Sequence, residues 1–171
     1  MPHMLAYDAS KFALMGFSEA LQADLGSSQA RVPVTTVIPG PMRTGSFYNA
    51  EFGGQQQAEF GWFALLSSLP VTSIDARRAA RRIVRAAREG APWVHLGVSS
   101  WSLDLLHRLS PSLAVRAMTL MGMLLPRSAG YRGELAKGRD VGQALAGSPA
   151  LHMGDVAAHR HNEAPPPDAA R

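Results

Sequence analysis

Tyr7 and Lys11 are the residues of this chain whose types and spacing could do chemistry. They stand four residues apart in A-Y-D-A-S-K-F-A-L, and in a helix this spacing puts both side chains on one face, about 5–6 Å apart. A phenol has an ordinary pKa of about 10, and a neighbouring ammonium lowers that pKa because it favours the phenolate. A shift of about three units takes roughly 4 kcal/mol. A tyrosine tuned in this way exchanges a proton with a carbonyl or alcohol oxygen, so we expect both residues to be catalytic.

A long helix must carry this pair. Apolar residues recur with a helical period over residues 4–25, and Gly26-Ser27-Ser28 ends the run. The apolar surface is wide, which predicts that more than one neighbour covers the helix. Residues 32–38 follow as a β-branched, almost continuously apolar run that is typical of a parallel strand buried on both faces. Pro39-Gly40-Pro41 stops this strand.

The next segment, residues 42–70, is irregular. We expect a long insert with one or two short helices and exposed aromatic residues (Phe47, Tyr48, Phe52, Phe60, Trp62 and Phe63). Ser73 then caps a helix over residues 74–89 that Gly90 ends. Its predicted core face is Ala76, Ala79, Ala80, Ile83, Val84 and Ala87. A short strand is predicted over residues 93–98, and the order helix, strand, helix, strand indicates an α/β layer.

Two further helices are predicted over residues 101–109 and 111–125, with Ser110 as the N-cap of the second. The second helix has about 15 residues and includes Arg116, whereas a membrane span needs about 20 apolar residues. We therefore expect it to be buried or interfacial. From residue 146 the composition turns to Pro, Ala, His and Asp, which predicts a disordered tail. Three regions are expected, with boundaries at 1–100, 101–145 and 146–171.

The helix and strand together resemble a known family. Y-D-A-S-K-F-A-L-M-G-F-S-E-A-L-Q-A-D-L followed by V-P-V-T-T-V-I-P-G-P-M-R-T-G-S-F is similar to the second half of the nucleotide-binding domain of short-chain dehydrogenases/reductases. The likeness is close over residues 5–47 and looser over residues 73–98. It implies a partial Rossmann-like, doubly wound α/β fold with additional C-terminal helices. It also implies an oxidoreductase that moves a hydride between NAD or NADP and an alcohol or carbonyl substrate.

The resemblance gives each matching residue a role. Tyr7 would be the catalytic acid or base, and Lys11 would assist it and bind the hydroxyls of the nicotinamide ribose. Pro39 and Gly40 would end the strand beside the nicotinamide, at the carboxyl end where open α/β sheets bind ligands. Thr44 would hydrogen-bond the carboxamide or phosphates. The insert would close over the substrate, and its aromatic residues indicate an apolar one.

The chain also departs from the family pattern. Residues 1–6 contain no serine to hold the substrate oxygen, and Ser10 lies on the wrong side of the tyrosine. No G-x-G-x-x-G follows a strand. We therefore expect the N-terminal cofactor-binding half to be absent and the chain to be truncated. The alternative is a catalytically inactive fragment that docks to a partner or a membrane surface.

Composition limits the remaining possibilities. The chain has no cysteine, which excludes disulfides and thiolate chemistry, and we predict no metal site because His159 and His161 are expected to be solvated. Met1-Pro2-His3 lacks the features of a signal peptide, so we expect a cytoplasmic protein. The wide apolar surface of the first helix is compatible with a homo-oligomer.

Six arginines form a cationic face on the helix over residues 74–89. We expect this face to be solvated, with nucleic acid and anionic lipid as the alternatives. Nucleic acid is not expected as a partner, since no aromatic residue interleaves with the arginines. Nucleic-acid binding would predict a steep dependence of affinity on salt.

Overall fold

The computed structural model describes residues 4–28, 30, 32–126, 135–142, 148–149, 151–161 and 163. It divides into two compact units, and each is described by itself. The first consists of Met1–Gly40 and Arg77–Gly122, and the second of Pro41–Ala76 and Met123–Arg171. The predicted boundaries near residues 100 and 145 stay a prediction.

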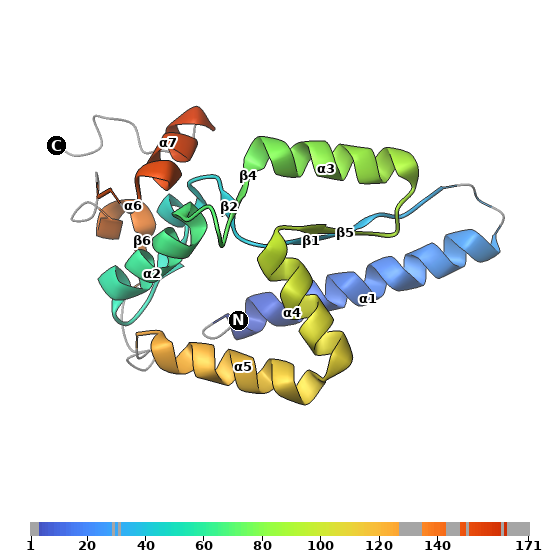
Figure 1. The fold of residues 1–171 in the computed structure, drawn as a ribbon, viewed down its shortest axis with the longest axis horizontal. Coiled ribbons are helices and arrows are strands. Elements are labelled where there is room, and N and C mark those ends of the chain that lie inside the picture. The colour runs from blue at the N-terminus through green and yellow to red at the C-terminus, as the bar shows by residue number, and fades with distance from the viewer. Residues whose placement is uncertain are drawn as a thin grey trace. The chain divides into compact units, whose positions relative to one another are not determined.

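A pair of parallel strands lies in the first unit (Figure 1). β1 (Thr36–Pro39) pairs with β5 (Trp93–Leu96), and Thr36 is opposite Trp93. The predicted parallel strand is thus confirmed, although it is shorter than expected and includes Pro39. The expectation that β1 is buried on both faces is wrong, because only Thr36 of its four residues is buried. A strand is buried on both faces only where helices or another sheet cover both sides of its own sheet.

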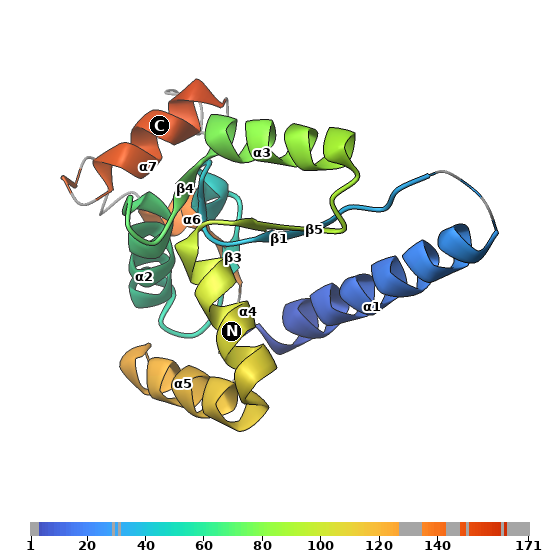
Figure 2. The same ribbon diagram turned by 45° about the vertical axis from the view of Figure 1, so that its right-hand side comes forward.

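The first helix, α1 (Leu5–Ser27), confirms the prediction for residues 4–25. The backbone N–H of Ser28 donates to the carbonyl of Asp24 at 3.1 Å, which satisfies one carbonyl at the helix end. None of the residues of α1 is buried, and Leu5 is 87% exposed. Within the described residues the helix is therefore not covered as expected. Figure 2 shows α1 as a long rod.

Three more helices belong wholly or mainly to the first unit. α3 (Ala76–Glu89) buries Ala79 and Ala86, whereas Ala80, Val84 and Ala87 of the predicted core face are exposed. The apolar residues do share one side of the helix, but only the edge that carries Ala79 and Ala86 is buried. α4 (Val98–Leu109) begins three residues earlier than predicted. α5 (Pro111–Leu124) confirms the predicted helix but not its burial, since Ala114 is its one buried residue. The N–H of Leu113 donates to the Ser110 hydroxyl at 3.3 Å, as expected of an N-cap.

The second unit is built from short elements. β2 (Met42–Arg43) pairs in parallel with β4 (Ile74–Asp75), and β3 (Glu51–Phe52) pairs antiparallel with β6 (Ala136–Lys137). The insert carries the 3₁₀ helix η1 (Ser46–Tyr48) and α2 (Gln56–Ser68), which confirms its expected short helices. α6 (Gly138–Val141) and α7 (His152–Arg160) complete the unit.

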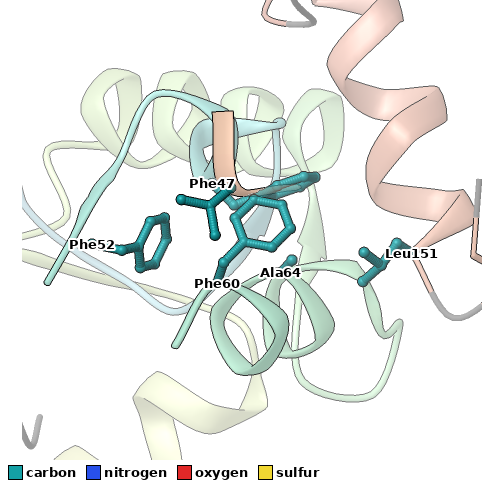
Figure 3. Close-up of a cluster of buried hydrophobic side chains, with 6 residues drawn as sticks. Phe47, Phe52, Phe60, Ala64 and Leu151 are labelled. Atoms are coloured by element: carbon teal, nitrogen blue, oxygen red, sulfur yellow. The ribbon is translucent and has the colours of Figure 1, made fainter. Parts of the chain in front are cut away.

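Aromatic residues of the insert form the core of the second unit (Figure 3). Phe47 and Phe60 are 0% and 1% exposed, and their rings meet edge to face at 5.8 Å between centroids. The Phe52 ring lies 5.6 Å from that of Phe60 in the same geometry. A Cβ at Gly142 would collide with the Phe60 ring. The expectation that Phe47, Phe52 and Phe60 are exposed is wrong, because they pack against one another and against Val141 and Leu151. Trp62 is 38% exposed, as expected.

The tail is also better ordered than expected. α7 packs against α2 and β2, and Leu151, Ala157 and Ala158 are buried. The prediction of disorder from residue 146 is therefore wrong for residues 151–161. The segment was predicted to be disordered because its small residues provide little apolar side-chain area. The same small residues allow its backbone to approach the aromatic core closely. Residues 164–171 of the predicted tail lie outside the described residues.

The chain is an α/β protein, as predicted. The partial Rossmann-like arrangement stays a prediction, since the described strands form three separate pairs. None of the described helices combines the length and apolarity that crossing a membrane requires.

The aromatic core can be tested by truncation. We expect Phe60→Ala to lower the free energy of unfolding by about 3–5 kcal/mol, because the ring is removed from a site with little room to collapse. Urea unfolding followed by circular dichroism measures this loss. Val71→Ala, at an exposed position of the same unit, should change stability by about 0.5 kcal/mol or less. Equal effects of the two substitutions would contradict the assigned core.

Candidate active site

Tyr7 and Lys11 lie side by side near the beginning of α1. The Nζ of Lys11 is 5.0 Å from the centroid of the Tyr7 ring, over its face. Tyr7 is 50% exposed and Lys11 is exposed. The four-residue spacing therefore brings the cation to the aromatic side chain as expected. The catalytic roles of the two residues stay a prediction.

Ser10 cannot supply a free hydroxyl beside this pair. Its Oγ donates to the backbone carbonyl of Tyr7 at 2.7 Å, so the hydroxyl is turned toward the helix backbone. This agrees with the expectation that Ser10 does not replace the missing serine of the family pattern. Phe12, two residues further along, has its ring 6.1 Å from that of His107, which links α1 to α4.

Pro39 and Gly40 lie at the carboxyl end of β1, where the first turn of α4 meets it. The N–H of Gly40 donates to the carbonyl of Leu96 at 2.9 Å. A Cβ at position 40 would stand 2.7 Å from the Ser99 Oγ and 3.0 Å from the Leu96 carbonyl oxygen. A side chain here would displace the Ser99 hydroxyl and press on the Leu96 carbonyl, so Gly40 favours the close approach of α4 to the strand end.

The predicted residues of the first unit thus form two groups. Tyr7 contacts Lys11, and Pro39-Gly40 contacts the start of α4. Among the described residues, the side chains of Tyr7 and Lys11 form no hydrogen bond, ion pair or ring contact with Pro39 or Gly40. The structure also shows no group of three or more His, Asp or Glu residues, within the part of the chain it describes, that could hold a metal ion.

A network of polar side chains joins β5 to α4. The Nε2 of His95 is 2.9 Å from the Oδ2 of Asp104, and the Nε of Arg108 donates to the same oxygen at 2.8 Å. The Arg108 guanidinium also lies over the Trp93 ring at 5.7 Å. Sequence reasoning missed this network. The spacing of Asp104 and Arg108, one helical turn apart, was the available signal.

Thr44 belongs to the second unit and begins a loop that α7 holds in place. The Thr44 Oγ1 accepts a hydrogen bond from the N–H of Ser46 at 3.4 Å. The next residue, Gly45, has a φ of 83°, and a Cβ there would collide with Ala158 of α7. A side chain at position 45 is therefore excluded twice, by its backbone conformation and by the packing of α7.

Tyr48, at the other end of the loop that begins at Thr44, forms a hydrogen bond with α7. Its hydroxyl donates to the Oδ1 of Asp155 at 2.8 Å. Burial, and then the hydrogen bond to Asp155 and the charge of that carboxylate, raise the pKa of the Tyr48 phenol above its ordinary value. Tyr48 therefore remains a proton donor. Sequence reasoning missed this contact, because Asp155 stands in the segment expected to be disordered.

Comparison with known proteins gives the family of the segment that contains the predicted site. A family model described as short chain dehydrogenase matches residues 1–51. Residues 1–51 are thus similar to the short-chain dehydrogenase/reductase family. All five predicted site residues, from Tyr7 to Thr44, lie inside this segment.

Curated relatives agree with the family. The chain is 32% identical over 113 residues to a protein named "Putative oxidoreductase SadH" from two strains of Mycobacterium tuberculosis. The match covers 66% of this chain and 40% of the relative. The chain therefore spans about 40% of the length of the curated relatives it matches. No solved structure matches it significantly.

The contact between Tyr48 and Asp155 predicts how stability depends on pH. Because the folded state raises the pKa of Tyr48, its contribution to stability is fully present below about pH 10 and is lost as the pH rises toward the folded value. We expect the unfolding free energy of the wild-type chain to fall more steeply above about pH 10 than that of Tyr48→Phe. Urea titrations at several alkaline pH values measure the two slopes.

A second pair of variants controls this result at neutral pH. Asp155→Ala removes the acceptor of a partly buried hydrogen bond and should cost about 1–2 kcal/mol. Asp140→Ala, at an exposed position of the same unit, should cost about 0.5 kcal/mol or less. Identical alkaline slopes for the wild type and Tyr48→Phe would refute the assigned environment of Tyr48.

Proposed function

We propose that the chain carries the proton-transfer residues of an NAD(P)-dependent oxidoreductase that interconverts an alcohol and a carbonyl compound. The observation that carries this proposal is the contact between Lys11 and Tyr7, with the ammonium 5.0 Å from the ring centroid, inside the segment that matches the family. A phenol beside a cation is suited to exchange a proton with a substrate oxygen.

The reaction requires two transfers to the carbonyl group. A bound nicotinamide would supply or accept the hydride at the substrate carbon. Tyr7 would donate its hydroxyl proton to the substrate oxygen in the reduction and take it back in the oxidation. Lys11 would stabilise the phenolate that remains after the proton has left.

The side chains of the site fit a nicotinamide ribose chemically. Lys11 offers an ammonium that can donate to the ribose hydroxyls, and Tyr7 is exposed enough to reach a ligand. Thr44 offers a hydroxyl for a carboxamide or a phosphate. The Pro39-Gly40 corner stands at the carboxyl end of a parallel strand, the usual position of a ligand in open α/β sheets.

The substrate class is less specific than the sequence suggested. Phe47, Phe52 and Phe60 are core residues, so they no longer support an apolar substrate. We propose a small-molecule alcohol or carbonyl compound, and we assign no preference between NAD and NADP.

Exposed apolar residues favour one alternative, a chain that docks to a partner without catalysis. α1 leaves Phe12 and Phe17 exposed, and α5 does the same for Leu113, Val115 and Leu120. Such faces are typical of helices that meet another protein. A homo-oligomer that pairs α1 with its copy is included in this alternative.

Substitution of the tyrosine tests the enzymatic proposal. With a longer protein that joins this chain to a cofactor-binding half, NAD(P)H and a panel of aldehydes and ketones, Tyr7→Phe should reduce kcat by about 100-fold or more, because the proton donor is lost. Stability should change by about 0.5 kcal/mol or less, since the tyrosine is half exposed. Ser10→Ala is the matched control on the same helix and should retain wild-type activity. Wild-type kcat in Tyr7→Phe would exclude the assigned role.

Cofactor binding separates the enzyme from the docking alternative. In a longer protein that joins this chain to a cofactor-binding half, titration of NADH and NADPH, followed by protein and nicotinamide fluorescence, should give saturable binding that Lys11→Met weakens about tenfold or more. The matched control is Arg116→Met, which removes an exposed cation from α5 and should leave the affinity for the cofactor unchanged. Absence of saturable binding and of turnover in that longer protein with wild-type Tyr7 and Lys11 would favour the docking alternative.

A further inference from the structure

α3 presents a strongly cationic face to solvent. Six of its 14 residues are arginines, all exposed, and we call them the arginine face: Arg77, Arg78, Arg81, Arg82, Arg85 and Arg88. The helix contains no lysine, and no acidic residue stands between the first and the last of these arginines. The remaining residues of this stretch are apolar.

The helix geometry gathers these charges on one side. At about 100° per residue, the six arginines fall within an arc of about 140°, and they extend over about 16 Å of helix. Ala79 and Ala86, 1% and 7% exposed, lie outside this arc and face the interior. The arginine face therefore points away from the core of the unit.

The charge pattern is unfavourable for the helix itself. Like charges three or four residues apart repel, and every arginine of the arginine face has at least one such neighbour. Arg77 and Arg78 also stand in the first turn, where the helix dipole disfavours a cation. A helix that is merely solvated usually mixes both signs of charge along its face. The arginine face carries only positive charge, in spite of the repulsion between its arginines and the unfavourable helix dipole. This pattern points to an anionic partner.

The surroundings of the arginine face favour a lipid surface over nucleic acid. Ala80, Val84 and Ala87 are exposed and form an apolar strip along one edge of the arginine face, with Val84 49% exposed. An apolar strip beside a cationic face suits a helix that lies in a membrane interface. The phosphate backbone of a nucleic acid offers no apolar surface that this strip could contact. α3 also contains no aromatic side chain on which bases could stack.

We propose that α3 docks the chain onto a membrane surface that contains anionic lipids. The planar guanidinium groups would bind the phosphate and carboxylate groups of the lipid headgroups. Val84 and the flanking alanines would contact the upper part of the acyl region. The chain would lie on the membrane without spanning it. This inference is independent of the proposed oxidoreductase function, since Tyr7 and Lys11 are on α1.

Vesicle binding by the full chain tests the proposal. Sedimentation with vesicles of phosphatidylcholine and phosphatidylserine should show binding that vesicles of phosphatidylcholine alone do not, and added salt should weaken it. The double variant Arg81→Gln/Arg85→Gln should bind the anionic vesicles about tenfold or more weakly. The control Arg116→Gln/Arg160→Gln removes the same charge from exposed positions outside α3 and should bind about as tightly as the wild type. An equal loss in both variants would overturn the proposal.

A second variant distinguishes lipid from nucleic acid. Val84→Asp should weaken vesicle binding, because it places a carboxylate in the apolar strip. Circular dichroism of all variants should show unchanged helix content. Binding of duplex DNA that is tighter than vesicle binding and insensitive to Val84→Asp would replace the lipid with nucleic acid. Absence of binding to anionic vesicles would show that the arginine face is simply solvated and would overturn the proposal.

Discussion

The parallel pairing of β1 and β5 is the constraint on which the arrangement of the chain depends. Thr36 is opposite Trp93, so strands that are far apart in sequence are neighbours in the sheet. Parallel strands cannot be joined by a tight turn and need a long crossover. The crossover here holds the insert as well as α3. The same pairing places the end of β1 beside the start of α4, where Gly40 allows the close approach of Ser99.

The electrostatics of the candidate pair depend on what covers it. Two unit charges about 5 Å apart attract by about 1 kcal/mol in water and by about 3 kcal/mol at an effective dielectric constant of about 20. Tyr7 is half exposed and Lys11 is exposed, so water weakens their interaction in the structure as described. A substrate, a cofactor or another surface that excludes water would strengthen it. The chemistry proposed for Tyr7 therefore requires a covered site.

The elements with strong periodicity and clear ends could be predicted from the sequence. α1, α5 and the parallel strand follow from apolar spacing, from Pro39-Gly40 and from the cap at Ser110. The contact between Tyr7 and Lys11 follows from helix geometry alone. The core of the second unit could not be predicted in this way, because its aromatic residues come from irregular segments that pair with distant partners. α7 was missed because small residues carry little apolar signal, even where they permit the closest packing.

The position of α7 has a consequence for the integrity of the second unit. Gly154 faces the Phe47 ring so closely that a Cβ would stand 3.1 Å from it, and Leu151 adds its side chain to the same cluster. A protease or an early stop codon that removed the chain from residue 150 onward would leave those rings in contact with water. Exposed aromatic surface of this kind promotes self-association. α7 therefore shields from water aromatic residues that precede it by about a hundred positions.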